Sequence, residues 1–162
     1  MKTIPAKTYP AKKHSKIIFQ KTTSITTAVL IEKLQSNYSF FMDMAHSEIN
    51  ELLSCCTRET FHPGYRIFSK GDVSDTFYLL VSGEIRILIG NREISITPGQ
   101  IFGEMTLFQA EKRTASAMTK KTSVVLSISS KVLSSQLLSL QRKVMTGLAH
   151  QLPKIFAAQT IR

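Results

Sequence analysis

The fold is decided most clearly by the stretch Glu84-Ile85-Arg86-Ile87-Leu88-Ile89-Gly90-Asn91-Arg92-Glu93-Ile94-Ser95-Ile96. Isoleucine occupies alternate positions in both halves of this stretch, and a period of two is typical of strands that bury one face. Gly90-Asn91 separates the halves, and a two-residue connection of this type predicts a β-hairpin. Pro98-Gly99 ends the second strand.

Further short strands on both sides of the hairpin predict a small barrel. Phe77-Tyr78-Leu79-Leu80-Val81 is an apolar run closed by Ser82-Gly83, and apolar residues alternate again at Val124, Leu126 and Ile128. Short strands at close spacing, separated by glycine-containing turns, indicate an antiparallel roll or barrel. We expect it to span about residues 58–128.

Helical patterns precede and follow this barrel. Two N-terminal helices are predicted from apolar residues at helical spacing, which are Val29, Leu30, Ile31 and Leu34 for the first, beginning near Thr27, and Ile49, Leu52, Leu53 and Cys56 for the second. Leucine or valine recurs every three or four residues from Leu133 to Leu152, which predicts a long amphipathic helix. Pro153 should end or kink it.

The chain is long enough for one domain, at 162 residues. Residues 27–162 are predicted to form it, with the C-terminal helices at about 129–158. Residues 1–26 contain Pro5, Pro10 and scattered lysine, threonine and serine without periodicity. We predict that they form a basic, mobile arm.

The net charge of +10 is distributed unevenly. Residues 1–31 contain six lysines and no acid, residues 112–162 contain nine lysines or arginines and no acid, and all 11 acids lie between them. Two basic ends can attract nucleic acid, an anionic lipid or an acidic protein partner, or can simply form a solvated surface.

Several classes of protein are not expected from the composition. No apolar run approaches the roughly 18 residues that a membrane span requires. The two cysteines, Cys55 and Cys56, are adjacent and poorly placed to bridge, which favours a reducing, cytoplasmic location. No metal site is expected, since the histidines and cysteines lack ligand spacing. An enzyme is not expected either, because no nucleophile with a base and no paired carboxylates appear.

A second informative stretch is Phe102-Gly103-Glu104-Met105-Thr106-Leu107-Phe108, followed by Arg113-Thr114-Ala115-Ser116. A ligand can approach the backbone of Gly103 closely, and residues 104–108 can form one helical turn whose first N–H groups point at an anion. Arg113 can add a planar, charged, bidentate donor. Glu104 can only accept, which suits a sugar hydroxyl beside a phosphate.

These residues resemble the phosphate-binding cassette of the cyclic nucleotide-binding domain family, F-G-E-(L/M/I)-x-L followed by R-(A/T/S)-A-(T/S). The resemblance covers about residues 35–150 and continues upstream in Gly71-Asp72, Asp75, Tyr78, Gly83 and Pro98-Gly99. It implies a mainly β fold, a double-stranded β-helix or jelly-roll barrel with N-terminal helices and a long C-terminal helix.

The resemblance also implies roles for individual residues. Glu104 is expected to take the ribose 2′-hydroxyl and Arg113 the cyclic phosphate of cyclic AMP or cyclic GMP, and no cofactor is expected. Thr114 is compatible with either adenine or guanine, and Ile87 is a candidate wall for the purine. The full set of predicted ligand-binding residues is Phe102, Gly103, Glu104, Met105, Thr106, Arg113, Thr114, Ala115 and Ile87.

The sequence departs from the family pattern at two positions. Thr106 stands where a small alanine or glycine is common, which adds bulk near the phosphate, and Lys112 stands where proline is frequent. Neither change removes a ligand-contacting group. Leu107 resembles the apolar residue that moves with the cassette and repacks against the following helix when ligand binds.

Two functions follow as alternatives. The first is a regulatory module that couples cyclic nucleotide binding to movement of the helix at 131–152. The second is a degenerate member with a vestigial pocket, in which Glu104 and Arg113 pair with each other and the basic ends hold a partner. A protein partner or a homodimer through the helix at 131–152 is expected. Specific DNA binding is not, since only about ten residues follow Leu152, too few for a helix-turn-helix.

Overall fold

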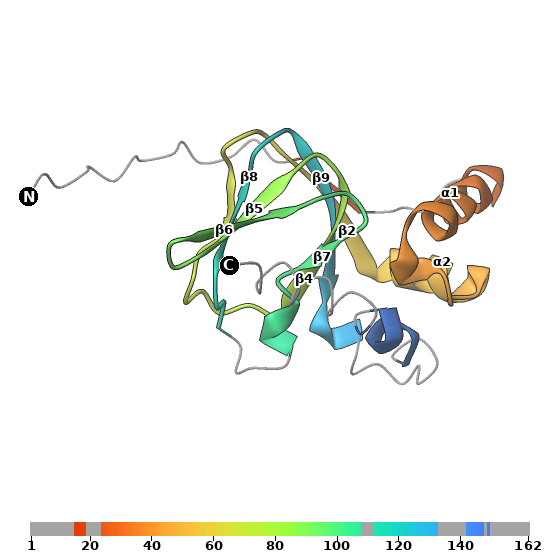
Figure 1. Ribbon diagram of the computed structural model, residues 1–162. Helices are drawn as coiled ribbons and strands as arrows, with labels where there is room; N and C mark the ends of the chain where they lie inside the picture. The colour runs from red at the N-terminus through yellow and green to blue at the C-terminus, as the bar shows by residue number, and fades with distance from the viewer. Residues whose placement is uncertain (1–14, 19–23, 108–111, 133–141, 148, 150–162) are drawn as a thin grey trace, which may run out of the picture.

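The protein, described here by a computed structural model, folds into two antiparallel sheets with helices at one side (Figure 1). The structure describes residues 15–18, 24–107, 112–132, 142–147 and 149. In spatial order, the five-stranded sheet contains β1 (Ser15–Ile18), β2 (Cys56–Phe61), β9 (Ser123–Ser129), β4 (Thr76–Ser82) and β7 (Ile101–Phe102). The four-stranded sheet contains β3 (Arg66–Phe68), β8 (Ser116–Thr119), β5 (Ile85–Ile89) and β6 (Arg92–Ile96).

The interior of the barrel lies between the two sheets. Strands β5 and β6 pair from Ile85 opposite Ile96 to Ile89 opposite Arg92, which confirms the hairpin and its turn at Gly90-Asn91. Both sheets contribute buried residues to one interior cluster, which consists of Phe61, Phe68, Leu80, Ile85, Ile96, Phe102, Ala117 and Val125. The predicted mainly β, jelly-roll class is therefore confirmed.

The opposite face of the five-stranded sheet is covered by helices. They are α1 (Ser24–Asn37), the 3-10 turn η1 (Ser39–Phe41), α2 (His46–Cys55) and residues 142–147. Residues on this face of β4 and β9 pack with helical residues in a second cluster, whose members include Phe77, Leu79, Leu126 and Ile128 from the strands and Ile49, Leu52, Phe40, Phe41 and Val144 from the helices. Alternate residues of β4 and β9 thus serve two cores.

Helix boundaries differ from the sequence-based expectation at two places. Helix α1 begins at Ser24, three residues inside the predicted arm. Cys56, predicted as the last apolar position of the second helix, is instead the first residue of β2, where its thiol donates to the Leu52 carbonyl at 3.1 Å.

The C-terminal helix is described only in part. Residues 142–147 are helical, whereas residues 133–141 and 150–152 of the predicted helix lie outside the described residues. Val144 is fully buried, and the Lys143 ammonium donates to the Asp43 carbonyl. A methyl group on Gly147 would lie 2.5 Å from the Phe40 ring and 2.8 Å from the Phe40 carbonyl oxygen. Gly147 therefore allows this helix to contact η1 closely.

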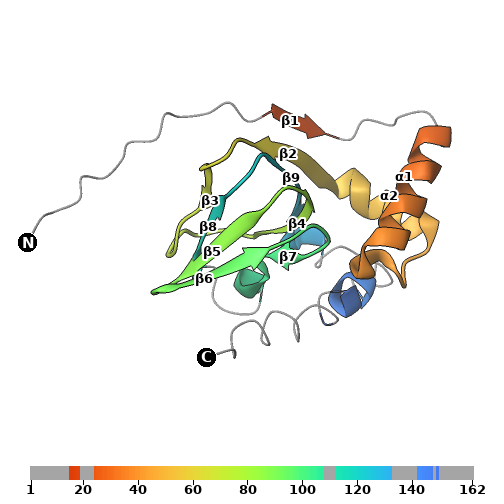
Figure 2. The same ribbon diagram turned by 45° about the horizontal axis from the view of Figure 1, so that its top comes forward.

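Part of the predicted N-terminal arm is a strand. Residues Ser15–Ile18 form β1, which pairs with β2 in antiparallel register and places Lys16 opposite Glu59 (Figure 2). The arm is thus not wholly irregular as expected, because the open edge of β2 supplies backbone partners. The other residues of 1–23 lie outside the described residues. Among the described helices, none is long and apolar enough to cross a membrane.

The Gly147 contact gives a test of the helix placement. We expect Gly147→Ala to lower the free energy of unfolding by about 1–3 kcal/mol, since the added methyl group overlaps Phe40. The loss should appear although alanine favours a helix by about 1 kcal/mol over glycine. Urea denaturation measures the change. The control is Met145→Ala, at an exposed position of the same helix, which should change the free energy of unfolding by less than about 0.5 kcal/mol. A stabilised Gly147→Ala variant would contradict this placement.

Candidate functional site

The backbone of Arg113 is fastened to the turn that precedes β4. The Arg113 N–H donates to the Asp72 carbonyl at 2.8 Å, and the Gly71 N–H donates to the Arg113 carbonyl at 2.8 Å. Next to this pair, the Lys70 N–H donates to the Ser116 hydroxyl at 2.9 Å. Two segments about 40 residues apart in sequence are thereby joined. These hydrogen bonds hold the Arg113 backbone in place independently of the contacts of its side chain.

The Arg113 guanidinium is buried and held by acceptors of this chain. Its Nη1 donates to the Gly103 carbonyl at 2.7 Å. Its Nη2 donates to the Ser74 hydroxyl at 2.8 Å and to the Thr76 carbonyl at 2.6 Å. The residue is only 3% exposed. Hydrogen bonds from a charged group are stronger than neutral ones, and here they offset the cost of removing the guanidinium from water.

Aromatic rings form a platform under the guanidinium. Its Cζ lies 4.0 Å from the centre of the Phe68 ring and 5.5 Å from that of Tyr78. Phe68, Tyr78 and Phe102 stack on one another, with ring centres 5.1–6.2 Å apart. A cation over a ring face is attracted by the electrons of the ring. The platform therefore favours the charged arginine and sets the plane in which it lies.

Charge states at the site follow from burial. Burial lowers the pKa of Arg113, while Tyr78, Asp72 and Glu104 act in the opposite direction, and an arginine keeps its proton at neutral pH. Burial raises the pKa of Glu104, because it disfavours the charged carboxylate, while the backbone N–H of Glu104 and the charge of Arg113 lower it. The carboxyl group of Glu104, in a residue 4% exposed, is thus costly to ionise in this site.

Gly103 lies between these two charged residues and has no room for a side chain. Its φ of +77° belongs to the left-handed region. A methyl group there would also lie 2.6 Å from Nη1 of Arg113. We expected a ligand to approach the backbone at this glycine, and in the structure the arginine of the same chain lies against it. Approach by a ligand stays a prediction. After Gly103 the chain enters η2 (Glu104–Leu107), a single helical turn within the predicted range 104–108, whose last residue lies outside the described residues.

The other predicted residues surround this pair at differing depth. Phe102 and Ala115 are buried, and Phe102 belongs to the aromatic stack. Met105 and Ile87 are half-buried, and Ile87 packs against the barrel interior opposite Ala117. Thr114 is exposed. Thr106 lies in η2, and its side chain is outside the described residues.

Sequence reasoning missed the residues that hold Arg113 in place. Ser74 lies in the turn before β4, Thr76 is the first residue of β4, and Phe68 is the last residue of β3. The spacing of a turn gives no sign that one hydroxyl faces an arginine 39 residues later. Tyr78 was noted only as part of the family pattern.

Among the described residues, no cluster of three or more histidine, cysteine or acidic side chains could hold a metal ion.

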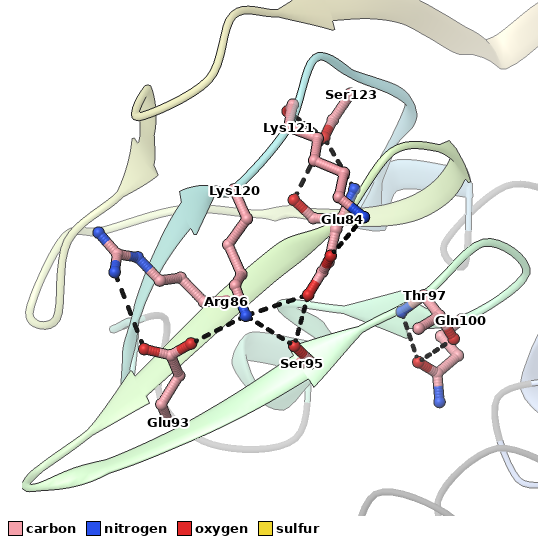
Figure 3. A network of polar contacts seen from close by, with 9 residues as sticks. All are labelled: Glu84, Arg86, Glu93, Ser95, Thr97, Gln100, Lys120, Lys121 and Ser123. Carbon is pink, nitrogen blue, oxygen red and sulfur yellow. Dashed lines mark hydrogen bonds and ion pairs between the residues drawn. The ribbon is translucent and has the colours of Figure 1, made fainter.

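Charged side chains on β5, β6 and the turns beside them form a second polar network (Figure 3). Glu84 forms ion pairs with Lys120 at 3.0 Å and Lys121 at 2.9 Å, and it accepts a hydrogen bond from the Ser95 hydroxyl at 3.0 Å. Glu93 pairs with Lys120 at 3.3 Å. The bonds from Lys121, Lys120 and Ser95 lower the pKa of Glu84 to about 2.

Comparison with known proteins identifies a family that matches about half of this chain. The sequence model described as "Cyclic nucleotide-binding domain" matches residues 58–139. The cGMP-dependent protein kinase of Toxoplasma gondii is 33% identical over 107 residues, which are 65% of this chain and 11% of the kinase. The cyclic AMP receptor protein of Thermus thermophilus is 32% identical over 94 residues, 54% of this chain and 44% of the receptor.

Solved structures agree in fold. The structure titled "Sp-2Cl-cAMPS bound to PKAR CBD2" superposes with a TM-score of 0.68 at 20% identity, covering 83% of this chain and 90% of that chain. At this identity the likeness concerns the fold alone. The chain spans a small part of the kinases that it matches, 11% of one and 14% of another.

The Glu84 network predicts a pH-dependent contribution to stability. Its folded pKa of about 2 lies below the ordinary value of 4.5, so the contribution is present above pH 4.5 and is lost as the pH falls toward 2. We expect Glu84→Gln to be less stable than the parent at neutral pH, with a difference that shrinks across this range and with added salt. Urea midpoints at several pH values measure it. Glu32→Gln, at an exposed residue with no ion pair in the described structure, serves as the control. A difference that does not change with pH would contradict the assignment.

Proposed function

The chain belongs to the cyclic nucleotide-binding domain family, and on that basis we propose that it binds cyclic AMP or cyclic GMP as a regulatory module. The observation that carries the proposal is the juxtaposition of two buried charged residues at one turn. Arg113 bonds the carbonyl of Gly103, and the next residue is the buried Glu104. Such a pair suits a ligand that presents an anion beside a hydroxyl.

Each group of the site has a role in this proposal. Arg113 attracts the cyclic phosphate through the full positive charge of its guanidinium, which stays protonated at neutral pH. Glu104 accepts a hydrogen bond from the ribose 2′-hydroxyl. The backbone N–H groups near Gly103, Met105 and Ala115 complete the phosphate cradle, and Thr106 lies in the same turn.

The choice between adenine and guanine falls to residues outside this pair. Thr114 is exposed, so its hydroxyl is available to a base, and Ile87 is half-buried on β5. The relatives divide on this point: cGMP-dependent kinases and a cyclic AMP receptor protein both match this chain. Both nucleotides therefore enter the test below. The bound nucleotide is a ligand, and the proposal includes no cofactor.

We propose a binding role without catalysis for this chain, in a cytoplasmic setting. No group of the site pairs a nucleophile with a base in the part of the chain that the structure describes. Both cysteines are free thiols, which suits a reducing compartment.

Output through the C-terminal helix is the finer part of the proposal. Ligand binding would favour one placement of the helix over another, by no more than its differential affinity for the two placements. The burial of Val144 and the close contact of Gly147 with Phe40 support an output that begins with packing inside this chain. A partner or a second copy would then contact other positions of the 131–152 segment, since Gly147 is already covered.

One observation favours a second candidate function. The Arg113 donors already have acceptors within this chain, as a purely structural arginine would. A member with a vestigial pocket would use Glu104 and Arg113 as a buried pair and bind a protein partner through its basic ends. The two candidates predict different consequences for the same substitutions.

Direct binding tests the leading proposal. We expect isothermal titration calorimetry to detect binding of cyclic AMP or cyclic GMP. Arg113→Ala should weaken it by about 100-fold or more, since the positive charge that faces the phosphate is lost. Arg92→Ala, an exposed arginine of the hairpin, should leave it unchanged. Absence of binding at millimolar ligand would refute the proposal.

Glu104→Gln separates the two candidates. Because burial raises the pKa of Glu104, the ionised form opposes folding at neutral pH, and the neutral amide should make the unliganded protein more stable there. The same change should weaken nucleotide binding several-fold, since a charge-assisted hydrogen bond is lost. The stability gain should fade as the pH drops and Glu104 takes up its proton. A variant that is less stable and never binds nucleotide would instead indicate a structural pair.

A further inference from the structure

Ser74 stands out among the residues that the proposed site does not use. It lies in the turn just before β4, is half-buried, and faces a guanidinium that approaches it from the loop before β8. We infer that Ser74 is a positioning residue for Arg113, and that its hydroxyl sets the affinity of the site for the phosphate of its ligand. This inference rests on the proposed function and assigns it one more determinant.

The Ser74 hydroxyl is oriented as an acceptor by its own turn. The Thr76 N–H donates to the Ser74 Oγ at 3.2 Å, and the Arg113 Nη2 donates to the same oxygen at 2.8 Å. Two donors on one hydroxyl direct its lone pairs toward them and leave its hydrogen to point elsewhere. The Ser74 oxygen is therefore held as an acceptor independently of the conformation of the Arg113 side chain.

The guanidinium needs such an in-plane contact. The Phe68 ring, 4.0 Å away, fixes the plane of the guanidinium but permits it to rotate within that plane. Hydrogen bonds to Gly103, Thr76 and Ser74 fix this rotation, and both hydrogens of Nη2 are engaged. The direction of the other N–H groups of the guanidinium follows from that rotation, so a hydrogen bond from one of them to a phosphate oxygen depends on that angle.

Among these three acceptors, Ser74 is the one whose contribution depends on the side chain. The Gly103 and Thr76 oxygens belong to the backbone and would persist with any residue. The orientation of Arg113 can thus be altered at Ser74 without moving the main chain. This makes position 74 a place where the sequence tunes the site.

The neighbouring carboxylates have other hydrogen bonds. Asp72 accepts from the Ser69 N–H at 2.8 Å, and Asp75 accepts from the hydroxyls of Thr76 at 3.1 Å and Ser129 at 3.3 Å. The group of this turn that accepts from the guanidinium is therefore the neutral Ser74 hydroxyl, although Asp72 and Asp75 lie close to Ser74 in sequence. The contact with Ser74 orients the guanidinium without neutralising its charge, which then acts on the anionic ligand.

Calorimetry on four proteins tests the inference. We expect Ser74→Ala to raise the dissociation constant for the cyclic nucleotide about tenfold, the size of one hydrogen bond from a charged donor. Ser74→Thr keeps the oxygen and should stay within about twofold of the parent. Ser82→Ala, the same change at the exposed far end of β4, should have no effect. Equal affinities of Ser74→Ala and the parent would overturn the inference.

A double-mutant cycle distinguishes positioning from general damage to the fold. In an Arg113→Lys background, the ammonium retains charge but has no planar fork for Ser74 to orient. Ser74→Ala should then weaken binding by less than about twofold, against tenfold in the parent background. An equal loss in both backgrounds would show that Ser74 acts on the fold rather than through Arg113, and would refute the positioning role.

A measurement without ligand separates this inference from the proposed function. In arginine side-chain NMR of the full chain, the parent should show slow rotation of the Arg113 guanidinium, and Ser74→Ala faster rotation. If the parent binds no cyclic nucleotide, the proposed function fails and the affinity claim fails with it. Unchanged rotation in Ser74→Ala would by itself overturn the positioning role.

Discussion

Arg113 contacts parts of the molecule that are far apart in sequence. Its main chain is bonded to the turn at Gly71 and Asp72, and its guanidinium rests on Phe68 of one sheet and Tyr78 of the other. Removing a guanidinium from water without partners would cost several kcal/mol. The surrounding acceptors and rings offset that cost.

Strand β4 connects this polar centre to the rest of the fold. The Thr76 carbonyl and the Tyr78 ring contact the arginine, whereas the side chains of Phe77 and Leu79 face the helices on the opposite side of the sheet. A single strand therefore separates the site from the core that contains Val144. Interiors are close-packed, so a small shift of β4 on one face has to be accommodated on the other. This proximity is the physical support for an output through the C-terminal segment.

Much of the fold was predictable because its signals are local. The hairpin of β5 and β6 follows from alternation and a two-residue turn. The family pattern assigned Gly103 and Arg113 to one site, and the structure brings these two residues together. The strand β1 was not predictable, because Ser15–Ile18 is short and gains its structure only from the edge of β2. The contacts of Ser74 and Phe68 with Arg113 were missed for a similar reason, since tertiary structure alone brings them together.

The placement of β1 also bears on how the domain can be isolated. The family match begins at residue 58, and a fragment cut before α1 would keep every residue of the site. It would also leave the outer backbone groups of β2 without the strand that now covers them. An open strand edge pairs readily with other chains. The backbone of Ser15–Ile18 thus occupies an edge at which another chain could otherwise add a strand.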